Sequence, residues 1–123
     1  MLSEDTTRFV SRTMSGDFFV EFRSVVRGYH VYRSDWTPVL GELLYTEQEL
    51  GNPEDRYAVS VLKSSTIVGH IPREISKLCW MFINRSGEIH CTVTGARQRS
   101  SLVQGGLEIP CIYRFSGKKN TRT

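Results

Sequence analysis

One short stretch of the chain contains four polar side chains that could bind a ligand. They are the amide of Asn52, the carboxylate of Asp55, the imidazole of His70 and the guanidinium of Arg73. Asn and Asp around a Pro are typical of a tight turn closed by side-chain bonds to the backbone, and an exposed Asp is also an acceptor for a ligand hydroxyl. His70 and Arg73 flank Pro72, which predicts a helix start where backbone N–H groups attract anions. The stretch therefore predicts either a site for a hydroxyl and a phosphate, or a turn and hairpin with structural roles only.

The sequence contains few signs of catalysis or metal binding. It has no GxSxG, GxxxxGK[ST] or GxGxxG segment, and its three histidines form no HxH or HxxxH pair. Cys79, Cys91 and Cys111 form no CxxC pair, and Cys91 would diverge from His90 because neighbouring strand residues point to opposite faces. We expect no catalytic residue, no metal and no cofactor, and we interpret the cysteines as buried, reduced thiols.

The elements that must position these residues are mostly strands. Alternating apolar residues predict strands over residues 18–26, 42–47, 56–62, 66–71, 88–95 and 107–115. The first strand could continue to Tyr32 after a kink at Gly28. Helical spacing predicts an amphipathic helix between Pro72 and Gly87, with a core-facing stripe of Ile75, Leu78, Cys79, Phe82 and Ile83. Together these elements predict a mainly β domain with one or two helices, built as a small six-stranded OB-like β-barrel.

The remaining features set boundaries. We expect residues 1–17 to form a flexible arm, 18–116 the barrel domain and 117–123 a polar basic tail. Acidic residues gather over 42–55 and basic residues after Arg97, a pattern of solvated faces more often than of a phosphate groove. Trp36 could be an exposed stacking group or a lid over the barrel mouth, and we predict the buried lid. Because no signal peptide and no long apolar run is present, we expect an intracellular protein without membrane contact.

Three segments together resemble the HIRAN domain family, and most closely its stand-alone animal members. They are Gly41-Glu42, the residues from Asn52 to Val61 and the residues from Ile67 to Glu74, in the order GE…NPxDxxAVxV…VGHIPRE. The resemblance implies a small β-barrel related to the OB fold. It also implies a nuclear protein of DNA repair that captures the 3′ end of single-stranded DNA.

The family's contacts can be carried over to five positions. Asp55 would accept a hydrogen bond from the terminal 3′-hydroxyl, His70 and Arg73 would contact phosphate, Asn52 would complete the turn, and Tyr32 would stack on a base. We therefore predict Tyr32, Asn52, Asp55, His70 and Arg73 as the DNA-binding residues.

Three positions depart from the family pattern, because Glu54, Val31 and Leu107 stand where end-binding members carry aromatic residues. Tyr29 or His30 could substitute for one of them. Stacking is worth about 1–3 kcal/mol per base, so two missing platforms weaken binding by roughly 2–6 kcal/mol. Two hypotheses follow: a non-enzymatic domain that binds 3′ ends of single-stranded DNA, and a HIRAN-fold protein–protein interaction module that has lost end recognition.

Overall fold

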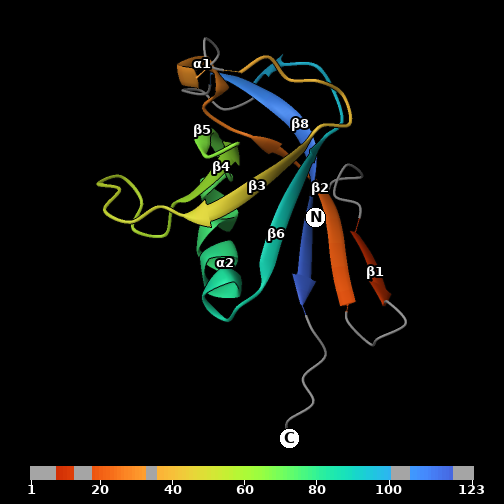
Figure 1. Cartoon of the computed structure of the whole chain (residues 1–123). Helices are drawn as coiled ribbons and strands as arrows, with labels where there is room; N and C mark the ends of the chain where they lie inside the picture. The colour runs from red at the N-terminus through yellow and green to blue at the C-terminus, as the bar shows by residue number, and fades with distance from the viewer. Residues whose placement is uncertain (1–7, 13–17, 33–35, 101–105, 118–123) are drawn as a thin grey trace, which may run out of the picture.

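The structure is a computed structural model, and it describes residues 8–12, 18–32, 36–100 and 106–117 (Figure 1). For residues 8–12, His30 and Tyr32 it describes the backbone alone. The described elements, in chain order, are β1 (Arg8–Arg12), β2 (Phe18–Val26), α1 (Tyr29–Tyr32), β3 (Leu43–Gln48), β4 (Val59–Lys63), β5 (Thr66–His70), α2 (Arg73–Asn84), β6 (Glu88–Val93), β7 (Gln98–Arg99) and β8 (Leu107–Gly117).

The strands form one antiparallel sheet in the order β1-β2-β8-β6-β3-β4-β5, and β7 adds to β8. The sheet curls, so that the residue after β2 reaches the last residue of β5. Arg27 and His70 each donate a backbone N–H to the other's carbonyl oxygen, both at 2.9 Å. We call this bridged pair the seam. The predicted mainly β, OB-like fold is confirmed. In the described part of the chain seven strands, not the predicted six, lie in a row, and the sheet is not closed into a barrel: one bridged pair, not a continuous ladder, joins its two sides at the seam.

The core lies inside the curl and follows the predicted alternation. On β8, Ile109, Cys111 and Tyr113 point inward, and the hydroxyl of Tyr113 donates to the carbonyl of Val25 at 2.7 Å. The three cysteines are free and buried as predicted, and burial raises the pKa of Cys79 to about 12. Other fully buried side chains are Val26, Leu44, Val59, Val61, Val68, Val93 and Cys91.

Helix α2 begins directly after Pro72, as predicted, and packs beneath the β4–β5 hairpin in Figure 1. Its inner face differs from the predicted stripe at one position, because the side chain of Leu78 is 63% exposed. Cys79 is buried as predicted, and Ser76, which was not in the stripe, is buried too, with its hydroxyl donating to Asp55. The predicted stripe residues that do pack against the core from partly buried positions are Ile75, Phe82 and Ile83.

Other segments also differ from the prediction. Residues 8–12, inside the predicted arm, form a strand on β2, whereas residues 1–7, 13–17 and 118–123 lie outside the described part of the chain. The first strand does not continue to Tyr32, because Gly28 has a positive φ of 81° and the chain turns into α1. Trp36 is buried as predicted, lies edge-on to Tyr29 and donates from Nε1 to Glu42 at 3.0 Å.

Candidate nucleic-acid interface

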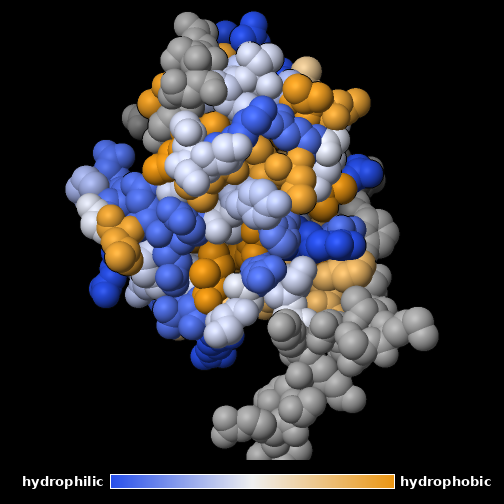
Figure 2. Space-filling view, in the orientation of Figure 1, coloured by the Kyte–Doolittle hydropathy of each residue, from blue (hydrophilic) through white to orange (hydrophobic). Residues whose placement is uncertain are grey.

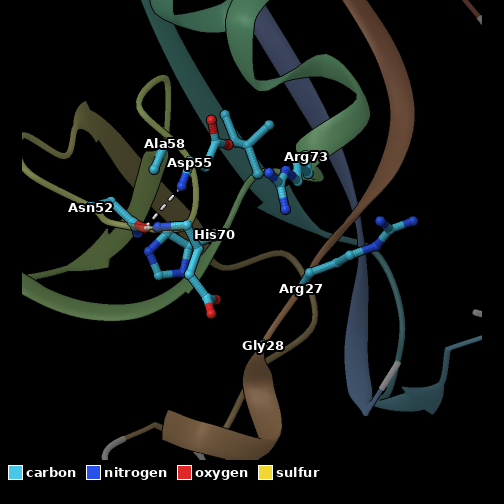
Figure 3. A pocket seen from close by; sticks show the side chains of 9 residues that line it. Arg27, Gly28, Asn52, Asp55, Ala58, His70 and Arg73 are labelled. Atoms are coloured by element: carbon cyan, nitrogen blue, oxygen red, sulfur yellow. Dashed lines mark hydrogen bonds between the residues drawn. The ribbon is translucent and has the colours of Figure 1, made fainter. Parts of the chain in front are cut away.

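An open cleft of about 270 Å³ lies beside the seam and brings four of the five predicted site residues together (Figure 3). They come from the loop after β3, the end of β5 and the first turn of α2. The fifth, Tyr32, is the last residue of α1, and its side chain lies outside the described part of the structure. The residues that line the cleft are Arg27, Gly28, Asn52, Glu54, Asp55, Ala58, His70, Ile71 and Arg73.

Asn52 shapes the turn that carries Asp55. Its Oδ1 accepts the backbone N–H groups of Glu54 at 2.8 Å and Asp55 at 3.2 Å, which is the side-chain-closed turn expected for Asn. Its Nδ2 donates to Glu49 Oε2 at 3.0 Å. Asn52 therefore uses both ends of its amide to fix the loop beside the cleft.

Asp55 ties this loop to α2 and retains free acceptor capacity. Its Oδ1 accepts the backbone N–H of Tyr57 at 2.9 Å, and its Oδ2 accepts the hydroxyl of Ser76 at 2.7 Å. An ionised carboxylate has about four lone-pair sites, so these two bonds leave room for a further donor. The half-buried carboxylate can accordingly accept a hydroxyl from a molecule in the cleft.

Glu49, which the sequence reasoning missed, connects the polar residues of the cleft. Its Oε1 accepts the hydroxyl of Ser60 at 2.7 Å and lies 2.5 Å from Nε2 of His70, while its Oε2 bonds to Asn52. The bond from Ser60 is the largest cause that lowers the pKa of Glu49, burial opposes it, and His70 lowers the pKa further. The carboxylate is therefore ionised at neutral pH and holds the imidazole at the cleft.

Two arginines line the cleft. Arg73 is exposed on the first turn of α2, and no described carboxylate forms an ion pair with it. Arg27, also missed from the sequence, contacts Glu74 through Nη1 at 2.6 Å and lies with Nε 3.6 Å from Oε2 of Glu108. This Nε and this Oε2 are buried and make no hydrogen bond in the described part of the chain. Arg73 thus gives the cleft a cation without a described carboxylate partner, whereas Glu74 and Glu108 balance the charge of Arg27, and the acidic Glu54 also lines the cleft.

The positions of the family aromatics supply no stacking surface. Val31 is 64% exposed and Leu107 packs against the core. Tyr29 is only 3% exposed, so the expectation that it could replace a lost platform is wrong, while the side chain of His30 lies outside the description. Among the residues whose side chains the structure describes, which do not include Tyr32, no Phe, Tyr or Trp lines the cleft.

Among the described residues, no group of three or more His, Cys, Asp or Glu is placed to hold a metal ion. None of the described helices has the length and apolar character that crossing a membrane requires. Of the basic C-terminal residues, Arg97 and Arg99 are exposed, and those after Gly117 fall beyond the described chain.

Comparison with solved structures identifies the fold. The HIRAN domain of human HLTF superposes with a TM-score of 0.64 at 20% sequence identity, over 80% of this chain and 77% of that chain. A protein from Lactobacillus plantarum superposes with a TM-score of 0.54, also at 20% identity, over 80% of this chain and 98% of that one. Neither a scan against protein-family models nor a search of curated proteins finds a match. The chain therefore has a HIRAN-like fold, as its motifs predict.

Proposed function

We propose that this chain is a non-enzymatic domain that binds the 3′ end of single-stranded DNA in the cleft beside the seam. The observation that carries the proposal is the convergence of a carboxylate with spare acceptor sites, Asp55, on one cleft with His70, Arg73 and Arg27. A terminal nucleotide offers the matching groups, a hydroxyl donor and a phosphate. Such a domain would act in the nucleus, in the repair or processing of DNA ends.

The energetics favour a weak, end-dependent interaction. A hydrogen bond to the charged carboxylate of Asp55 is worth about 1.5–3 kcal/mol, and a 3′-phosphate would replace this attraction by repulsion. Without an aromatic platform in the described part of the cleft, phosphate contacts must supply much of the rest. Each phosphate that the protein neutralises on a single strand makes the slope of the log association constant against log salt concentration more negative by about 0.7. Binding should therefore weaken as the salt concentration rises.

The test is fluorescence anisotropy with labelled short single strands that end in a 3′-hydroxyl or a 3′-phosphate. The wild-type chain should bind the free hydroxyl at least tenfold more tightly, and Asp55→Ala should remove this preference. Ser76→Ala is the matched control, because it removes the helix partner of Asp55 and leaves the carboxylate. Equal binding of both strands by the wild-type chain would refute end recognition.

The second candidate is a protein–protein interaction module with the same fold. Glu54 on the cleft lining favours it, because a carboxylate repels phosphate and provides no surface for a base. The same titration separates the candidates: if neither strand binds at low salt, where phosphate contacts are strongest, the interaction module is supported.

A further inference from the structure

A cluster of cationic and aromatic side chains lies beside the cleft and is not part of it. The guanidinium carbon of Arg56 lies 5.2 Å from the ring centroid of Tyr57, and Nζ of Lys77 lies 5.3 Å from the same centroid. The ring of Trp80 meets Tyr57 edge-on, with centroids 5.9 Å apart. Arg56 and Lys77 are exposed, while the two rings are half-buried. We call these four residues the basic–aromatic cluster.

The cluster continues the cleft along both segments that carry it. Arg56 follows Asp55 directly in the chain, and Lys77 lies one helical turn after Arg73, about 6 Å further along the axis of α2. The hydrogen bond from Ser76 to Asp55 ties these two segments together at the boundary. Figure 2 shows mainly hydrophilic residues over the projecting loop between β3 and β4, from which Arg56 and Tyr57 come.

The cations of this surface are available to a partner. Within the described part of the chain, no carboxylate forms an ion pair with Arg56, Arg73 or Lys77, whereas Lys63 and Arg114 elsewhere on the sheet each pair with a glutamate. A cation over an exposed ring gains about 0.5–1 kcal/mol. Tyr57 therefore holds two long side chains partly ordered before binding, which lowers the entropy lost on binding.

We propose that the basic–aromatic cluster binds the phosphodiester backbone of a single strand, on the 5′ side of the end held in the cleft. The inference rests on the proposed function and extends it from one terminal nucleotide to a longer strand. Arg73 lines the cleft, and Arg56 and Lys77 meet at the ring of Tyr57 next to it, so three cations without a carboxylate partner in the described part of the chain share this surface. Several cations beside one hydroxyl acceptor suit a polymer with regularly repeated charges that enters the cleft by one end.

The experiment compares oligothymidines of 3 and 12 nucleotides with free 3′-hydroxyls, again by anisotropy. The wild-type chain should bind the 12-mer at least tenfold more tightly than the 3-mer. The double variant Arg56→Glu/Lys77→Glu should lose this gain and should flatten the salt slope for the 12-mer by about 1.4, the contribution of two phosphates. Its affinity for the 3-mer should stay within about twofold. Arg85→Glu is the matched control, because Arg85 is an exposed cation just beyond the other end of α2. This variant should change the affinity for neither the 3-mer nor the 12-mer.

Other outcomes are equally decisive. The proposal would be overturned if the wild-type chain bound the 3-mer and the 12-mer with equal affinity, or if the double variant bound the 12-mer as tightly as the wild type does. It would also be overturned if poly-glutamate competed for binding more strongly than unlabelled DNA. The milder variant Arg56→Gln/Lys77→Gln should lose a smaller part of the affinity gained from the 3-mer to the 12-mer. Because it introduces no new charge, it serves as the test if the double glutamate variant misfolds. If the 12-mer binds through the cluster but without preference for a 3′-hydroxyl, end recognition fails and the backbone contact stands.

Discussion

Replacing Glu49 by Ala removes the acceptor that joins the loop after β3 to β4 and β5 beside the cleft. Ser60 is 1% exposed, so its hydroxyl would lose its partner in a place that water does not reach, at a cost of about 1–3 kcal/mol. His70 and Asn52 are half-buried and can turn partly toward solvent, so their lost bonds add roughly 0.5 kcal/mol each. We expect Glu49→Ala to lower the free energy of unfolding by about 2–4 kcal/mol, a large part of the 5–15 kcal/mol typical of a domain.

The assay is urea unfolding at pH 7, followed by tryptophan fluorescence. The midpoint should fall while the slope m stays constant, because the mutation changes the native state and not the surface exposed on unfolding. In thermal melts, 1 kcal/mol corresponds to about 4 °C for a chain of this size, so a shift of roughly 8–16 °C is expected.

Glu47→Ala provides the matched control. Glu47 is an exposed glutamate on β3, two residues before Glu49, so its loss should change stability by less than about 0.5 kcal/mol. A loss of under 1 kcal/mol in Glu49→Ala, or an equal loss in Glu47→Ala, would show that the bonds to Glu49 do not stabilise the cleft.

Three more outcomes can be checked with the same unfolding measurements. A Cβ at Gly69 would lie 2.4 Å from Cγ1 of Val26 and 2.7 Å from the carbonyl oxygen of Arg27, so Gly69→Ala should destabilise by about 1–3 kcal/mol; an unchanged midpoint would mean that β5 can move away. Because the folded pKa of Glu49 lies below its ordinary value, the stability that its carboxylate contributes is complete above about pH 5 and is lost as pH falls through the folded pKa, so Glu49→Gln should flatten the fall in stability on the acid side of about pH 5. Leu78→Gln should change stability by less than about 0.5 kcal/mol, since that side chain is exposed; a loss above 1.5 kcal/mol would place it in a contact that the structure lacks.

Local chemistry explains why much of the fold was predictable. Alternating apolar residues on the strands, the Asn–Pro–Asp turn and Pro72 before the helix each act over a few residues, and each is found close to where the sequence placed it, although the strand predicted over residues 56–62 begins only at Val59. Helical spacing predicted which way α2 faces but not the width of the face it buries, so Leu78 was assigned to the core wrongly.

The site was predictable only in part, because its remaining residues arrive through tertiary structure. Glu49 stood in an acidic stretch that the sequence reasoning treated as solvated, and only the packing of β3 against β4 brings it to Ser60. Arg27 reaches the cleft because the seam pairs it with His70, far along the chain. Asp55, His70 and Arg73 line one cleft, and their roles toward a ligand stay predictions.

The position of the seam links occupancy of the cleft to the integrity of the whole sheet. Arg27 and His70 belong to opposite sides of the curled sheet, they are joined by two backbone hydrogen bonds, and both line the cleft. A ligand that touches both would act as a latch across this junction, and binding to the folded state alone adds its free energy to stability. The amide hydrogens of these two residues would then exchange with deuterium more slowly in the complex than in the free chain, so their protection reports occupancy directly.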